Sequence, residues 1–207
     1  MAAKAKANKS DKEKCRVLTP EFRVSYPHVF KPQGMNNKPN SQKKYSITML
    51  FPKDADLGPI KEAMRQAKVQ KFGEDKTKWP KGLESPVTDG DSPKNADKEG
   101  YAGHWAIKAS SNEDQKPGVV DQNVEPIINQ GDFYPGCYAR ASLLAYIWDN
   151  EFGQGVGFIL DHVQKMREGK SFAGKPQANE VFSPVGTGDE EDFASAQAEE
   201  EQEESFM

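Results

Sequence analysis

The chain has 207 residues, of which 35% are hydrophobic and 29% are charged. This length allows one domain with a substantial core, and the low hydrophobic share predicts long polar segments around it. No stretch approaches the roughly 20 apolar residues that span a bilayer, and the basic N-terminus lacks the apolar segment of a secretory signal. Cys15, Cys137 and three scattered histidines match no disulfide framework or zinc motif. We therefore expect two reduced thiols, no metal and no cofactor.

The net charge of −4 conceals two regions of opposite charge. Nine of the 32 acidic residues and none of the 28 basic ones lie in 189–207, so the preceding residues carry 28 basic against 23 acidic side chains, a balance of +5. Blocks of like charge repel and stay disordered. We expect a disordered basic arm at 1–15, a folded domain at 16–170, a linker at 171–188 and a disordered acidic tail at 189–207.

The first part of the expected domain has the alternating pattern of paired strands. Phe22, Val24 and Tyr26 alternate with polar residues, and Pro27 is expected to end that strand. A turn-rich stretch leads to a second strand at 43–51. Its predicted inner face carries Tyr45, Ile47, Met49 and Phe51.

A helix and a long loop are expected next. After two aspartates, apolar residues recur at helical spacing: Ile60, Ala63, Met64, Ala67 and Phe72. Residues 73–100 are rich in glycine, proline and charge, and a loop of that length is expected to be functional or mobile. It carries Trp79 among lysines, where no core is evident.

The later strands include the most informative segment, 137–148. A strand is expected near 101–109, with Trp105 more consistent with the core, and short strands near 118–128. In 137–148, alternate residues form a small apolar face, whereas the other face carries Tyr138, Arg140, Ser142, Leu144, Tyr146 and Trp148. A turn leads to a returning strand at 156–166, which predicts a hairpin.

These elements predict a mainly β fold. Five or six strands, one helix and long loops favour an OB-fold-like antiparallel barrel followed by the acidic tail. The helix follows the second predicted strand, whereas the usual OB order places it after the third.

Basic and aromatic residues on such a fold point to single-stranded nucleic acid. Binding without sequence preference needs cations for phosphates and aromatic rings for unstacked bases. The candidate contacts are Lys43, Lys44, Trp79, Lys108, Tyr138, Arg140, Tyr146 and Trp148. For any single aromatic residue the alternative is a structural role, because aromatic side chains on strands often pack in a core or in cross-strand pairs.

The acidic tail has two interpretations. It is a solubility tail, or it competes with nucleic acid for the basic surface at high effective concentration. In the second case, displacement by a long strand frees Phe206 to bind a partner protein.

Six segments in order resemble a bacteriophage family of OB-fold single-stranded DNA-binding proteins, first catalogued as a domain of unknown function: "VLTPEFRVSYPHVFKP", "KKYSITMLFPK", "KWPKG", "YAGHWAIKASS", "YPGCYARASLLAYIW" and "GVGFILDHVQKMREG". The resemblance covers about 16–185. It implies single-stranded DNA as partner, a role in phage replication or recombination in the host cytoplasm, and no catalysis. The tail departs from the family pattern, because Met207 follows Phe206, which puts recruitment through a terminal aromatic in doubt.

Three other functions are compatible with parts of the sequence. A strand-annealing or recombination mediator and an RNA-binding chaperone use the same physics, and only RNA adds the 2′-hydroxyl. A metal-dependent nuclease needs clustered carboxylates, but Asp161 and His162 are adjacent and face opposite sides of a strand. No nucleotide-binding or hydrolase motif appears.

Overall fold

A computed structural model describes residues 9–34, 42–151 and 153–172, with side chains from residue 12 onward. The acidic tail, Phe206 and most of the expected linker lie outside the described residues. Where a disordered arm was expected, Lys9–Lys14 forms the short helix α1. No helix of the described part is long and apolar enough to cross a membrane.

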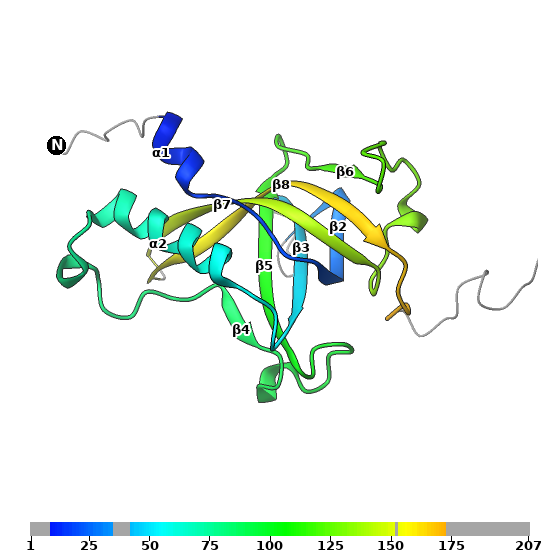
Figure 1. Ribbon diagram of the computed structural model, residues 1–207, viewed down its shortest axis with the longest axis horizontal. Coiled ribbons are helices and arrows are strands. Elements are labelled where there is room, and N and C mark those ends of the chain that lie inside the picture. The colour runs from blue at the N-terminus through cyan, green and yellow to red at the C-terminus, as the bar shows by residue number, and fades with distance from the viewer. Residues whose placement is uncertain (1–8, 35–41, 152, 173–207) are drawn as a thin grey trace, which may run out of the picture. The chain divides into compact units, whose positions relative to one another are not determined.

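Five strands close a ring in the order β7, β2, β3, β5, β8 and back to β7 (Figure 1). β5 and β8 are parallel, and the other neighbours in the ring are antiparallel. This arrangement confirms the predicted mainly β, OB-fold-like architecture. The ring strands are β2 (Phe22–Gly34), β3 (Lys43–Pro52), β5 (His104–Asn112), β7 (Tyr138–Asn150) and β8 (Gly153–Arg167).

Short elements extend the ring at its edges. β1 pairs with β7, β4 pairs with β5, and β6 pairs with β8. Three single 3-10 turns lie in the long connections. The bounds are β1 (Arg16–Leu18), β4 (Val87–Asp89), β6 (Gly118–Val120), η2 (Lys76–Lys78), η3 (Pro93–Asn95) and η4 (Gln130–Asp132).

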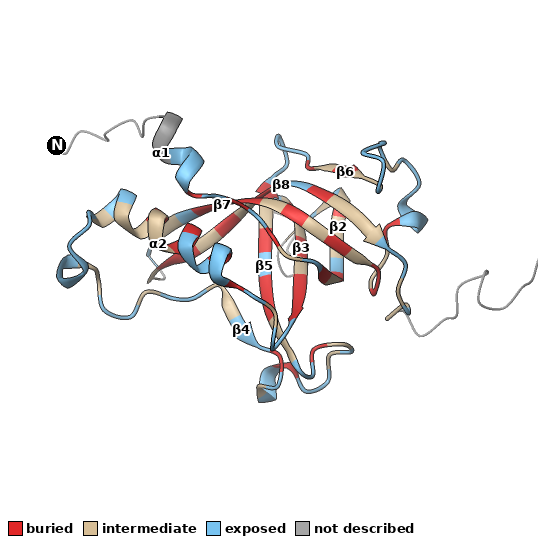
Figure 2. Ribbon diagram, viewed as in Figure 1, coloured by how far each residue is buried: buried red, intermediate tan, exposed pale blue. Residues whose placement is uncertain are grey.

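The core lies inside the ring, where alternate side chains of each strand meet. The predicted inner face of β3 is buried, and so is the small apolar face of β7 up to Ala145. Figure 2 shows this alternation as buried and partly exposed stripes along the ring strands. The core includes Tyr45, Ile47, Met49, Phe51, Ala139, Ala141, Leu143 and Ala145.

Helix α2 (Gly58–Phe72) packs against β7 and β1 (Figure 1). Four of the five predicted residues, Ile60, Ala63, Met64 and Ala67, form its buried face. Phe72, the last residue of the helix, is only half-buried. The helix follows β3, the second strand of the ring, as the sequence indicated. Its apolar face belongs to the same core cluster as the inner faces of β3 and β7. The helix packs mainly on β7 and β1, which leaves the outer face of β3 and β5 to other partners.

The prediction that Pro27 ends its strand is wrong. β2 continues through Pro27 to Gly34, with register shifts against β3 between Ser25 and His28 and again before Gln33. The regular pairing of the two strands is interrupted at a bulge. Pro27 has no amide hydrogen, but at the bulge this causes no loss of a hydrogen bond between the strands. The extension brings His28 and Gln33 alongside β3.

Candidate nucleic-acid interface

The outer face of β3 and β5 carries polar side chains between the two paired strands. Lys44 pairs in register with Asn112, and Thr48 pairs with Lys108. Because side chains alternate across a strand, these residues point away from the core that their neighbours fill. Lys44 and Thr48 are half-buried, whereas Lys108 and Asn112 are exposed.

Three adjoining hollows lie along this face. The central hollow, of about 400 Å³, contains Lys44, Lys108 and Ser110 in its wall. It shares Lys108 with a hollow of about 350 Å³ that reaches Tyr101, and it shares Lys44 and Ser110 with one of about 250 Å³ that reaches Tyr146. None of the described residues that line the three is acidic. We call the three together the β3–β5 groove.

The groove has a positive charge of its own. Lys44, Lys94 and Lys108 line it and form no ion pair with another described residue. His28 lies in the central hollow, and burial lowers its pKa below the ordinary value of 6.5, with a further decrease from the charge of Lys108. His28 is therefore neutral at pH 7, and the lysines supply the charge.

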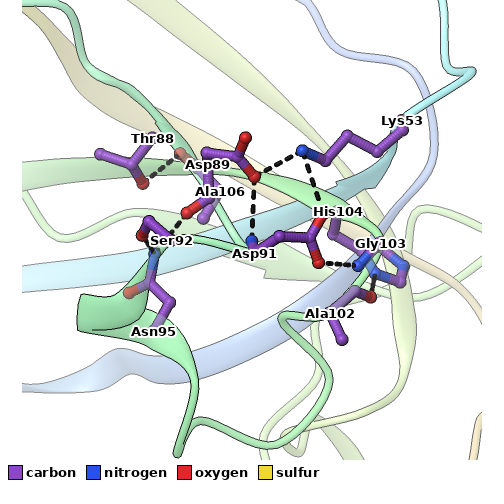
Figure 3. A network of polar contacts seen from close by, with 10 residues as sticks. All are labelled: Lys53, Thr88, Asp89, Asp91, Ser92, Asn95, Ala102, Gly103, His104 and Ala106. Carbon is purple, nitrogen blue, oxygen red and sulfur yellow. Dashed lines mark hydrogen bonds and ion pairs between the residues drawn. The ribbon is translucent and has the colours of Figure 1, made fainter.

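A polar network holds the loop that brings two lysines to this groove (Figure 3). The Asn95 side-chain amide donates to the backbone carbonyl of Asp89 at 2.7 Å, and the Gly103 amide donates to the Asp91 carboxylate at 2.7 Å. Lys53 forms ion pairs with both aspartates. The pKa of Asp89 is lowered mainly by Lys53 and that of Asp91 mainly by the Gly103 amide, so both stay charged. The network orders the 89–104 loop, which carries Lys94 and Lys98.

Aromatic rings lie on a stripe of glycines at the tip of the β7–β8 hairpin. Tyr146 pairs with Gly157, and Trp148 pairs with Gly155. A Cβ atom on Gly157 would lie 2.9 Å from the Tyr146 ring, and one on Gly155 would lie 2.6 Å from the Trp148 ring. The rings therefore rest on the glycine backbone, an arrangement that stabilises β-sheets. Tyr146 remains 37% exposed and lines the groove.

Tyr138 and Arg140 lie at the other end of β7 and have partners within the protein. The Arg167 guanidinium lies 3.3 Å from the centre of the Tyr138 ring, and the Arg23 guanidinium lies 5.3 Å from it. Arg140 donates from Nε to Gln164 Oε1 at 2.8 Å. Neither residue lines the groove.

The two remaining candidates differ in position. Trp79 donates from its indole nitrogen to the carbonyl of Gly73 at 2.9 Å, and Lys68 of α2 lies over its ring at 5.7 Å. It is thus placed beside the end of α2 and does not line the groove. Lys43 is exposed at the start of β3, next to Lys44.

Sequence reasoning missed the groove residues that lie outside the strands it predicted. His28 and Gln33 depend on the extension of β2 past a proline, and Lys94 and Lys98 lie in a loop whose path the sequence pattern does not give. The available signal was the length of 73–100, which indicated a functional loop. Among the residues that the structure describes, no three His, Cys, Asp or Glu side chains gather to hold a metal ion.

Comparisons with known proteins find phage single-stranded DNA-binding proteins. The family model of the Enterobacter phage Enc34 ssDNA-binding protein matches residues 15–194. A structure of the single-stranded DNA-binding protein from bacteriophage Enc34 in complex with ssDNA is 26% identical and has a TM-score of 0.64, covering 80% of this chain and 96% of its own. Another structure of the same protein is 25% identical, with a TM-score of 0.59 and coverages of 86% and 97%. Comparison with curated proteins finds no significant match.

A more distant structure shares the fold. The single-stranded DNA-binding protein gp2.5 of bacteriophage T7 is 14% identical, with a TM-score of 0.55, and covers 78% of this chain and 97% of its own. The family expected from the sequence is confirmed, since the model match extends over most of the chain. The chain belongs to the family of the Enterobacter phage Enc34 ssDNA-binding protein.

Proposed function

We propose that this protein binds single-stranded DNA in the β3–β5 groove without sequence preference. The observation that carries the proposal is a groove whose described lining holds no acidic residue, has lysines without an ion pair to another described residue, and ends at exposed Tyr146. The second and third strands of an OB-fold ring, with the hairpin between the fourth and fifth, are where this fold binds oligonucleotides. In this chain those elements are β3, β5 and the β7–β8 turn.

The lysines and the aromatic rings of the site match the phosphates and the bases of a single strand, respectively. Lys44, Lys94 and Lys108 neutralise phosphates, and each neutralised phosphate of a single strand contributes about −0.7 to the slope of log K against log salt. Tyr146 and Trp148 offer rings for bases, at about 1–3 kcal/mol per stacked base. Neither interaction reads base identity.

A double substitution tests the phosphate half. Lys44→Ala with Lys108→Ala should reduce the salt slope of oligo-dT binding by about 1.4 and weaken binding most at low salt. The matched control is Lys61→Ala with Lys71→Ala, which removes the same charge from the exposed side of α2. Titration of tryptophan fluorescence gives both values. Equal slopes for the two double variants would contradict the placement of DNA in this groove.

We further propose that the protein acts by binding alone, in phage replication or recombination within the host cytoplasm. Support comes from the family match and from the part of the groove lining that the structure describes, which holds no carboxylate to act as acid, base or metal ligand. Competition between DNA and RNA oligonucleotides of equal length tests the choice of polymer, because only RNA presents a 2′-hydroxyl. A strand-annealing assay distinguishes simple coating from mediation of recombination.

The acidic tail is proposed to compete with DNA for this groove and to present Phe206 to a partner protein once DNA displaces it. The support is charge complementarity between nine acidic residues in 189–207 and the lysine-lined groove. Deletion of 189–207 should tighten DNA binding most at low salt, since the competition is electrostatic. Equal affinity of the full chain and the truncated chain across a salt series would remove the competition.

A further inference from the structure

A fourth hollow of about 400 Å³ opens beside the groove on the β2 side. It shares His28 and Gln33 with the central hollow of the groove, so the two form one continuous surface. Its walls are aromatic, with Tyr26 and Phe30 from β2 and Tyr134 from the segment before β7. None of its described lining residues is acidic. The lysine-lined β3–β5 groove is therefore continuous with a hollow lined by aromatic residues.

Tyr26 has an unusual backbone for an aromatic residue. Its φ is +45°, in the left-handed region that side chains with a Cβ atom rarely adopt, and it sits where β2 shifts register against β3. The residue remains 52% exposed, so burial of its side chain does not compensate the strain. Strained residues cluster at functional sites, where the strain directs a side chain. Tyr26 lines the fourth hollow from this bulge.

The opposite wall is held rigidly. The Tyr134 hydroxyl donates to the Glu168 carboxylate at 2.6 Å and accepts a hydrogen bond from the Gly169 amide at 3.2 Å. The Lys165 ammonium lies 5.3 Å from the centre of its ring. Phe133 is buried at the base of the hollow, and exposed Lys31 lies at its edge, where it can meet a phosphate.

We propose that the fourth hollow is a nucleobase subsite, in which Tyr26 stacks on a base of the same single strand as that strand leaves the groove past His28. The proposal deepens the proposed function and rests on it. Aromatic rings stack on any base. A single strand can occupy both the aromatic hollow and the adjoining lysine-lined groove, whereas a free nucleotide is too short to do so and a peptide lacks the regular row of phosphates. The occupant is therefore a base at one end of a bound strand, present only when the strand is long enough to reach it.

Length-dependent binding tests the subsite. For oligo-dT from about 4 to about 16 nucleotides, the range of site sizes of OB-folds, Tyr26→Asn should leave the shortest oligomers unaffected and weaken the longer ones about tenfold. Asparagine tolerates the left-handed region, so the thermal midpoint of unfolding should stay within about 2 °C of the parent protein. Tyr26→Phe keeps the ring and should restore full affinity for long oligomers.

The possible results separate the subsite from the groove. Parent-like affinity of Tyr26→Asn at every length overturns the subsite and leaves the groove proposal intact. Equal weakening at every length also overturns it, because Tyr26 then acts in the groove itself or through the fold. If Lys44→Ala with Lys108→Ala binds like its α2 control while Tyr26→Asn still weakens long oligomers, the groove proposal fails and the aromatic hollow is a binding site in its own right.

Discussion

The two ends of β7 carry similar residues and have different surroundings. At the hairpin end, Tyr146 and Trp148 lie over glycines, and Tyr146 lines the β3–β5 groove. At the other end, Tyr138 lies between Arg23 and Arg167. At the hairpin end, part of the Tyr146 ring is accessible to a ligand. At the other end, the Tyr138 ring is already in contact with two arginine side chains of the protein.

This difference arises from the residues opposite each ring. Glycine on β8 leaves a bare backbone on which Tyr146 and Trp148 rest. Opposite Tyr138 the register places Arg167, whose guanidinium also pairs with Glu21 at 2.7 Å. An aromatic ring on an exposed strand face is therefore open to a base or occupied by the protein, according to its cross-strand partner.

Removal of both hairpin rings should have the largest effect. Tyr146→Ala with Trp148→Ala should weaken oligo-dT binding by about 100-fold, because two stacking sites of about 1–3 kcal/mol each are lost. Fluorescence anisotropy of a labelled oligomer measures this directly. The control is Tyr138→Ala, for which we expect a change in affinity within about twofold. A larger loss in the control than in the double variant would reverse the comparison.

Tyr138→Ala should instead reduce stability. It removes two cation–π contacts and the packing of a half-buried ring, which predicts a loss of about 1–3 kcal/mol in the free energy of unfolding. The midpoint of thermal unfolding should fall by about 4–8 °C for a loss of about 2 kcal/mol. An unchanged midpoint together with weakened DNA binding would show that Tyr138 serves the ligand.

A methyl group at Gly155 should disturb the hairpin end alone. Its Cβ would lie 2.6 Å from the Trp148 ring, so the ring must move. We expect Gly155→Ala to weaken oligo-dT binding about fivefold with little change in thermal midpoint, because the displaced ring lies at the surface. Tryptophan fluorescence should report the movement before any DNA is added. Parent-like fluorescence and affinity together would mean that the position of this ring is irrelevant.

The smallest effect concerns His28. Its folded-state pKa lies below its unfolded value of 6.5, so the folded protein binds fewer protons and its stability falls as the pH drops through 6.5. His28→Gln should therefore lose less of its thermal midpoint between about pH 7.5 and about pH 5.5 than the parent does. The same pH dependence in both proteins would show that His28 stays close to its unfolded pKa.

The alternation of residue types along the sequence predicted which side chains share a face of a strand. It did not predict which residues of the neighbouring strand lie opposite them. It placed Tyr138, Tyr146 and Trp148 on one face of a strand, and the core face opposite was correct up to Ala145. Register depends on the fold of the whole ring, so no local pattern indicated that Arg167 would lie opposite Tyr138. The hairpin, the helix and the β3 core face were predictable because each is set by local periodicity.

The remaining parts of the site depend on irregular structure. Pro27 indicated a strand end, but a bulge carries β2 onward and brings His28 to the groove. Lys94 lies in a loop that reaches the groove. Hydrogen bonds of Asn95 and Asp91 to other residues of the same long connection order this loop. No periodic pattern marks such positions, because turns and bulges follow tertiary packing.

Cross-linking tests most directly which end of β7 contacts DNA. Irradiation of the full chain bound to an oligomer containing 5-bromodeoxyuridine, followed by mass spectrometry of the peptides, locates the rings that touch bases. We predict cross-links at Tyr146 or Trp148, and none at Tyr138. Cross-links at Tyr138, with the hairpin rings unmodified, would contradict the assignment of the β3–β5 groove as the DNA-binding surface.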